Sequence, residues 1–307
     1  MDNIILTTMK TSEEVALKIY NLLLQQLRPF LHNVQLEYKV FTHFSEFECQ
    51  NVSVQSWKHS ERSDICESIA SAIACYLIEE EETRILRHLI INEFAYDGHV
   101  EVNKIMDFCL QTIHLEDDET TDRDRRPRQK TVTHEIKHYL KKNNYLNIDG
   151  LLQFRLKDYI AELREVVEYA IDEFIMDKQY QEFIALLKYF VYIQEAKIPV
   201  VHLMHKGGNE FVLLNDQMRP IETGDLESFS VEVLDKDFNF EDLIVSTLIS
   251  VAPQKIYIHM RDPFAPVIQT IIQIFEDRTQ LCEYCRQCIP ILGEPVDKTN
   301  SVLDRDA

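Results

Sequence analysis

The chain has 307 residues, of which 45% are hydrophobic, so it can bury a sizeable core without a disulfide or metal staple. Its 32 basic and 52 acidic residues give a formal charge of −20, which repels phosphate backbones and acidic lipid surfaces, so no nucleic-acid partner is expected. Only six glycines are present, and they build neither a Walker A nor a GxGxxG loop, which excludes the nucleotide-binding enzymes that depend on such loops.

The first region, residues 1–114, is expected to be helical with one pair of strands. Residues 11–27 have apolar side chains at helical spacing behind an N-cap at Thr11 or Ser12. Two alternating stretches that are rich in β-forming residues predict a strand pair at 34–44 and 49–57. Helical spacing then predicts three further helices, at residues 63–80, 83–95 and 102–114.

No export or membrane segment is visible in the sequence. The first residues lack the basic region and the sustained apolar run of a signal peptide. Nowhere does an apolar run approach the roughly 20 residues that a membrane helix needs. We therefore expect a cytoplasmic protein, whose seven cysteines are thiols or metal ligands in a reducing environment.

A block of charge separates the first region from the rest of the chain. Residues 116–122 are acidic and residues 123–130 are basic, with no large apolar side chain among them. A block of charged residues without apolar side chains cannot form part of a hydrophobic core, so residues 115–130 are predicted to form an exposed linker.

The strongest periodic signal lies between residues 149 and 196. Apolar side chains follow one another at steps of three and four, which traces one face of a helix. No proline interrupts this segment, and the next one after it is Pro199. A single rod of this length would measure about 70 Å, too long for one compact domain of this size. We therefore predict a break near Asp177 and a helical hairpin within residues 131–197.

The last third of the chain is expected to form a small α/β layer over residues 198–289, followed by a tail at 290–307. The predicted order is a strand hairpin, a third strand, a helix, a strand and a helix, at residues 200–204, 210–214, 228–234, 240–251, 255–260 and 265–278. The predicted fold class is thus α+β, predominantly helical, with a central helical hairpin and a small C-terminal α/β layer.

The central and C-terminal segments resemble the YtxC-like family of sporulation proteins from spore-forming Firmicutes. The residues that carry the resemblance are 146–159, 170–174, 182–191, 239–244 and 251–256. The resemblance implies a cytosolic protein linked to sporulation, and it supplies no catalytic residues. Any site must therefore be argued from the chemistry of the side chains.

Three cysteines near the C-terminus, Cys282, Cys285 and Cys288, form a C-x-x-C-x-x-C pattern. Gaps of two residues let successive thiolates face one metal ion, as zinc and iron–sulfur sites require. A tetrahedral site needs a fourth ligand, for which the candidates are a second subunit, a histidine such as His259, or one of Cys49, Cys66, Cys75 and Cys109. The alternative is a continued helix that buries the three thiols on one face, without metal.

A second pattern, H-E-x-x-H, is formed by His134, Glu135 and His138, with Glu168 as a conceivable third ligand. In zinc hydrolases this pattern places two imidazoles one turn apart and supplies a glutamate general base. However, Lys137 flanks the face that would hold the cation, and the predicted helix is short. An exposed helix with two solvated histidines is the favoured interpretation.

Together these observations predict a non-enzymatic sporulation protein that acts through a protein partner. No cofactor is expected, with zinc or an iron–sulfur cluster at Cys282, Cys285 and Cys288 as the alternative. A zinc-dependent hydrolase that uses His134, Glu135 and His138 is the other alternative. The sequence defines neither the partner nor the oligomeric state.

Overall fold

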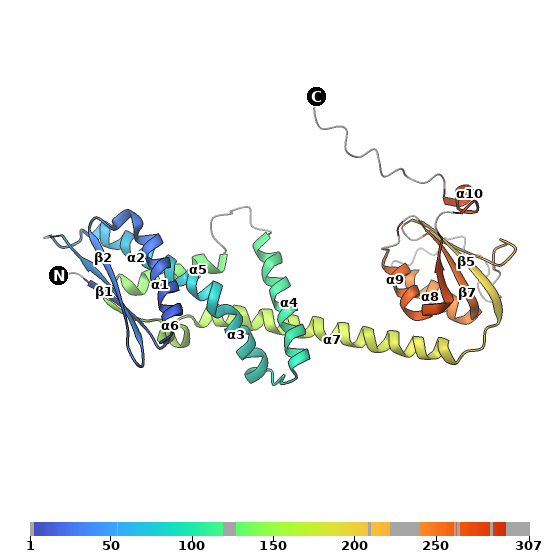
Figure 1. Cartoon of the computed structure of the whole chain (residues 1–307), viewed down its shortest axis with the longest axis horizontal. Coiled ribbons are helices and arrows are strands. Elements are labelled where there is room, and N and C mark those ends of the chain that lie inside the picture. The colour runs from blue at the N-terminus through green and yellow to red at the C-terminus, as the bar shows by residue number, and fades with distance from the viewer. Residues whose placement is uncertain are drawn as a thin grey trace, which may run out of the picture. The chain divides into compact units, whose positions relative to one another are not determined.

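The computed structural model describes residues 3–53, 55–118, 127–207, 210–221, 240–260, 262, 265–282 and 285–292 (Figure 1). The chain divides into two compact units, unit 1 (Met1–Met176) and unit 2 (Asp177–Ala307). Each unit has a hydrophobic core of its own and one small mixed sheet. The fold is therefore predominantly helical α+β, as the sequence predicted.

The sheet of unit 1 has the strand order β2-β3-β1-β4. The antiparallel pair β2–β3 confirms the predicted strand pair, although β3 begins and ends earlier than expected. The sequence did not predict β1 and β4, which pair in parallel beside it. Side chains of β3 are buried alternately, so one face of the sheet packs on the core. The strands are β1 (Asn3–Thr8), β2 (Val34–Val40), β3 (Ser45–Asn51) and β4 (Tyr145–Asn147).

The helices of unit 1 include one long helical run in place of two predicted helices. It continues from α2 through a π-helical turn, η2, into α3 and a second π-helical turn, η3. The backbone keeps helical dihedral angles where these segments join, so no loop separates the predicted helices 63–80 and 83–95. The helices are α1 (Glu13–Leu27), η1 (Arg28–Phe30), α2 (His59–Tyr76), η2 (Leu77–Glu81), α3 (Glu82–His88), η3 (Leu89–Glu93), α4 (His99–Asp118) and α5 (Pro127–Leu140).

The predicted linker at 115–130 is too long at both ends. Residues 115–118 are the last residues of α4, and residues 127–130 are the first of α5. Arg128 is buried in an ion pair with Glu82, which explains how a residue of the charged block enters the core. Residues 119–126 lie outside the described residues.

The prediction of a central helical hairpin was wrong. The segment breaks at Arg155–Leu156, between α6 (Ile148–Phe154) and α7 (Lys157–Ile193), and α7 then runs without interruption through Asp177. Neither glycine nor proline occurs in α7, so nothing in the sequence stops the helix. The length argument failed because it assumed one compact domain, whereas the boundary between units 1 and 2 falls inside α7, after Met176.

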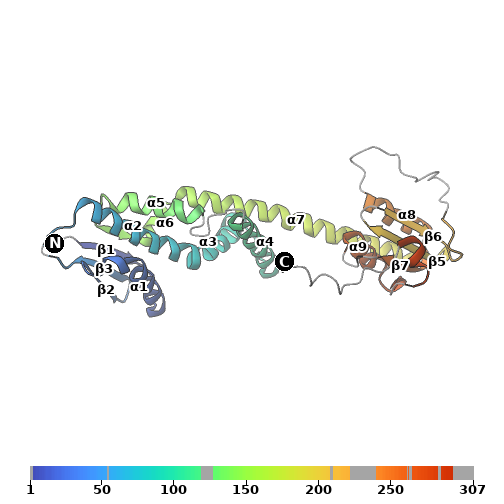
Figure 2. The same cartoon turned by 90° about the horizontal axis from the view of Figure 1, so that it is seen from above.

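Unit 2 is built on a sheet of order β6-β5-β7-β8, in which β6 is antiparallel and the other pairs are parallel. Figure 2 labels β5, β6 and β7 of this sheet together with α8 and α9. The predicted helix at 240–251 is confirmed, and the predicted strand at 255–260 and helix at 265–278 are confirmed with shifted ends. The predicted strand at 228–234 lies outside the described residues. The predicted tail begins too early, since residues 290–292 belong to α10. The elements are β5 (Ile198–Gly207), β6 (Glu210–Leu214), α8 (Phe240–Val251), β7 (Pro253–Met260), α9 (Pro266–Phe275), η4 (Glu276–Arg278), β8 (Thr279–Leu281) and α10 (Cys288–Leu292).

Among the described residues, no helix combines the length and the apolar character that crossing a bilayer requires. The charged residues distributed along α7, the longest helix, illustrate why.

Candidate metal centre

The two faces of β7 have different roles in unit 2. Ile256 and Ile258 are fully buried in the hydrophobic core together with residues of α8 and α9. Successive residues of a strand point to opposite faces, so Tyr257 and His259 lie on the other face of the sheet. His259 is only 3% exposed there, because α10 contacts both β5 and β7. The alternation of β7 thus places one imidazole in a covered position outside the apolar core.

The parallel pairing of β8 with β7 brings Cys282 to this histidine. The register aligns Tyr257 with Gln280 and Ile258 with Leu281. Cys282 follows directly, and its backbone N–H donates to the carbonyl of Ile258 at 2.9 Å. The position level with His259, on the same face of the sheet, is therefore taken by a cysteine.

The other two cysteines enter the cluster through a turn. The N–H of Cys288 donates to the carbonyl of Cys285 at 2.9 Å, and the N–H of Cys285 donates to Sγ of Cys282 at 3.3 Å. Cys288 is the first residue of α10 and is 1% exposed. Cys282 and Cys285 precede that helix, so the structure does not follow the alternative in which one continued helix buries all three thiols.

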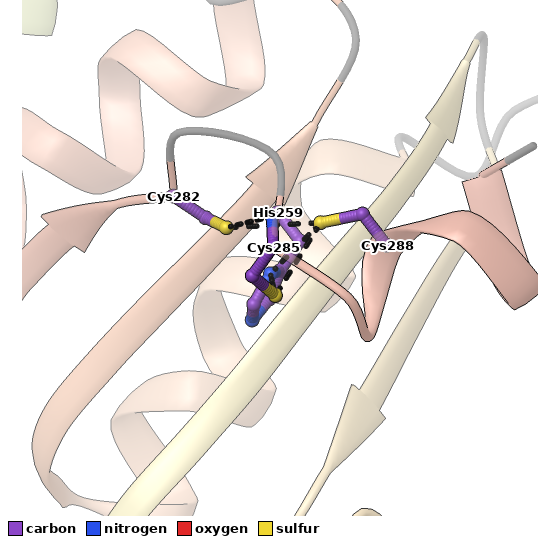
Figure 3. Close-up of side chains that lie close together, drawn as sticks. All are labelled: His259, Cys282, Cys285 and Cys288. Carbon is purple, nitrogen blue, oxygen red and sulfur yellow. Dashed lines mark hydrogen bonds between the residues drawn. The ribbon is translucent and has the colours of Figure 1, made fainter. Parts of the chain in front are cut away.

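All four side chains point toward one another (Figure 3). Nδ1 of His259 lies 3.3 Å from Sγ of Cys288 and 3.7 Å from Sγ of Cys285. Sγ of Cys288 lies 3.7 Å from Sγ of Cys282 and 3.8 Å from Sγ of Cys285. The four ligand atoms all lie within 4.8 Å of one another. We refer to this group as the Cys3His cluster.

Four of these separations, from 3.3 to 3.8 Å, are close to the edges of a zinc tetrahedron. Zinc binds sulfur at about 2.3 Å and nitrogen at about 2.0–2.1 Å, which places ligand sulfurs about 3.8 Å apart and the nitrogen about 3.6 Å from each sulfur. An iron–sulfur cluster distributes its cysteines over several irons and therefore needs wider spacing. The donor set and its spacing thus fit a single tetrahedral ion, and zinc is the metal that prefers it.

The pKa values of the cluster's side chains are shifted in different directions. Burial lowers the pKa of His259, and the neighbouring His202 lowers it further, so the imidazole is held neutral, the form that ligates metals. Burial raises the pKa of the Cys288 thiol to about 12. Burial also acts to raise the pKa of Cys285, but hydrogen bonds from Gln287, Cys282 and Cys288 outweigh it and lower that pKa. Cys285 is accordingly better prepared than Cys288 to become a thiolate.

A second histidine orients the first. Nε2 of His259 lies 3.0 Å from Nδ1 of His202 on β5, so the proton on Nε2 is donated to His202 when Nδ1 faces the sulfurs. Burial lowers the pKa of His202, which keeps its Nδ1 available as an acceptor. Its ring also stacks on Tyr257, with centroids 5.3 Å apart. Metal-binding histidines commonly donate their second ring nitrogen in this way.

The remaining cysteines do not join the cluster, and all seven are free. Cys49, Cys66, Cys75 and Cys109 belong to β3, α2 and α4 of unit 1. Burial raises the pKa of Cys49 and of Cys109 to about 12, which makes these two thiols unreactive. Among the candidates for a fourth ligand, the structure places His259 at the cysteines.

The H-E-x-x-H pattern does not assemble a site in the structure. His134 and Glu135 lie on α5 with side chains that are 77% and 51% exposed, and His138 is exposed as well. Lys137 is paired with Glu67 at 2.7 Å. Within the described part of the chain, no third ligand such as Glu168 completes the group. The zinc-hydrolase alternative therefore lacks the coordination it requires.

The fold and the Cys3His cluster together define a predominantly helical α+β protein whose C-terminal unit carries four potential metal ligands. The chain belongs to the YtxC-like family, whose model matches residues 67–280 and confirms the resemblance seen in the sequence. It is similar to the "Uncharacterized protein YtxC" of Bacillus subtilis (strain 168), with 24% identity over 213 residues that cover 67% of this chain and 73% of that protein. No solved structure matches the chain. His202 and His259 lie inside the family match, whereas the three cysteines follow its end.

Proposed function

We propose that unit 2 is a zinc-binding module in which Cys282, Cys285, Cys288 and His259 hold one structural zinc ion. The convergence of four donor atoms at tetrahedral spacing carries this proposal. Four protein ligands fill the coordination shell of zinc, whereas catalytic zinc keeps one position for water or substrate. The burial of His259 and Cys288 further supports a structural ion. The protein is accordingly non-enzymatic in this proposal.

The zinc ion ties the C-terminal segment to the sheet. Cys285 lies in the turn before α10, and Cys288 is the first residue of α10. His259 belongs to the central strand β7. A helix of five residues is too short to be stable by itself, so α10 needs such an anchor. In this proposal the metal holds α10 over the face of the sheet that carries His202 and His259.

We expect protein purified without chelator to contain about one zinc ion per chain, by elemental analysis. Cys285→Ser should lose the metal, because three ligands cannot close the tetrahedron and serine is a poor zinc ligand. Replacing zinc by Co²⁺ should give sulfur-to-cobalt absorption bands that are absent in the variant. His202→Phe should keep the ring stacked on Tyr257 but weaken zinc binding about 10- to 100-fold, because His259 loses its acceptor.

Two controls separate this site from the alternatives. Cys75→Ser removes a thiol of unit 1 that donates a hydrogen bond to Glu79, and this variant should leave the zinc content unchanged. His138→Ala should also retain the metal. Wild-type protein without zinc, or zinc that survives Cys285→Ser and Cys288→Ser, would contradict the proposal. Zinc lost only in His138→Ala would restore the hydrolase alternative.

The biological setting we propose is sporulation, in the cytoplasm and through a protein partner. Membership of the YtxC-like family, whose resemblance links the chain to sporulation, supports this setting. Deleting the gene in its native host should reduce the number of heat-resistant spores, and the wild-type gene should restore it. An unchanged spore count would remove sporulation from the proposal and leave the zinc module untouched.

A further inference from the structure

The C-terminal half of α7 has apolar residues on two faces. One face is buried in unit 2, where Ile184 and Val191 are each 4% exposed and belong to its core. The other face carries four large apolar side chains that remain 46–65% exposed, namely Phe183, Leu186, Phe190 and Ile193. We call these four residues the α7 stripe. A helix that is apolar on two faces is typical of one that packs on two sides.

The spacing of the α7 stripe is that of a coiled-coil seam. Its residues follow one another at steps of three, four and three, which are the a and d positions of two heptads. Tyr189, which is 65% exposed, flanks the stripe, and Glu182 is a charged neighbour. Seams of this kind accept a second helix whose side chains have the same spacing.

On the same face of α7 in unit 1, three of the four corresponding positions are acidic and the fourth is Ile175. Eighteen residues make five turns of an α-helix, so Glu165, Glu168 and Asp172 stand at the same angular positions as Phe183, Leu186 and Phe190. All three acidic side chains are exposed, as expected for a face in water. Because this face of α7 changes from mostly acidic to apolar, we expect residues 183–193 to be covered by another protein surface.

The amount of apolar surface suits a dimer. Large aromatic and aliphatic side chains present about 150–250 Å² each, so the half-exposed stripe and Tyr189 offer roughly 500 Å² per chain. Two copies would bury about 1,000 Å² of apolar surface, and a polar rim brings this into the range of about 1,200–2,000 Å² seen in specific interfaces. An isolated patch of this size is also near the upper limit for monomeric proteins.

We propose that the α7 stripe is a homodimer interface, in which α7 of one chain packs against α7 of a second copy. A second copy supplies by construction a helix with matching three-four-three spacing, and a two-fold axis lets the same surface meet itself. Aromatic side chains at the centre of such a contact are frequent in protein interfaces. The inference does not depend on the zinc ion.

Sedimentation velocity and light scattering on the full chain test this proposal across a wide concentration range. The wild type should be a dimer, and Phe183→Glu and Leu186→Glu should each raise the dissociation constant about 100-fold or more, because a charge would enter the apolar contact. Added salt should strengthen the wild-type dimer, since each chain has a formal charge of −20 and salt screens the repulsion.

A matched control is available on the same helix. Tyr192 is 84% exposed and stands two residues, or about 200°, away from Phe190, so Tyr192→Glu should leave the dimer intact. Unchanged helical circular dichroism would show that the variants are folded. A wild type that is monomeric at all concentrations would overturn the proposal. A dimer that persists in both stripe variants would also overturn the proposal. The same holds if the stripe binds only a different protein.

Discussion

Removing zinc with a chelator is expected to lower the unfolding midpoint of unit 2 by roughly 10 °C or more. A ligand that binds only the folded state stabilises it by about 4 kcal/mol when its free concentration is a thousand times the dissociation constant. The ligands of the proposed ion span β7, the end of β8 and α10, so its loss frees the segment that covers one face of the sheet. Differential scanning calorimetry with and without chelator measures the change.

Unit 1 provides an internal control for this experiment. The two units have separate hydrophobic cores, and the Cys3His cluster belongs entirely to unit 2. The transition of unit 1 should therefore keep its midpoint in the presence of the chelator. Limited proteolysis can assign the transitions, because the first new cleavages after metal removal should fall near α10. Equal shifts in both units, or none in either, would contradict a structural zinc ion in unit 2.

Part of the candidate site was visible in the sequence, because a C-x-x-C-x-x-C pattern is a local feature. The sequence offered His259 only as one of several candidates for a fourth ligand, since the choice depends on the parallel register that sets Cys282 beside His259. His202 was missed as a neighbour of the site for a related reason. Its contact with His259 arises from the pairing of β5 with β7, between residues that lie 57 positions apart.

The fold shows the same division between local and long-range information. Strong periodicity predicted helices such as α1 and α8 well, because an amphipathic face is encoded within a few turns. The short strand β4 was missed, as its three residues carry too little pattern and become a strand only through pairing with β1. The length of α7 was misjudged since the end of a helix was inferred from the size of a domain, and not from a stop signal near Asp177.

The buried ion pair of unit 1 is a further feature that spacing alone does not reveal. Glu82, the first residue of α3, and Arg128 of α5 have side chains that are 7% and 8% exposed, with Nε of the arginine 3.7 Å from the carboxylate. The hydroxyl of Tyr159 donates to the same carboxylate at 2.9 Å. Burial and the charge of Glu82 raise the pKa of Tyr159 far above its usual value, so the hydroxyl keeps its proton and remains a donor.

Glu82→Gln is expected to destabilise unit 1 by about 3–5 kcal/mol, because it leaves the Arg128 charge buried without its anion. The glutamine still accepts the hydrogen bond from Tyr159, so the loss reports mainly on the missing charge. Glu80→Gln is the matched control, as it breaks the Lys18 pair, whose side chains are 45% and 41% exposed, and should leave the stability of unit 1 almost unchanged. Denaturant unfolding of unit 1 measures both free energies.

A double variant distinguishes a pair that stabilises the fold from one that is merely costly to break. Replacing both partners, with Glu82→Leu and Arg128→Met, removes the two buried charges together and should restore most of the stability that Glu82→Gln loses. The reason is that the desolvation of two ions offsets much of their attraction. A double variant as unstable as Glu82→Gln would show that the pair and its Tyr159 hydrogen bond make a net favourable contribution to unit 1. Equal stability of Glu82→Gln and Glu80→Gln would instead mean that water reaches Arg128.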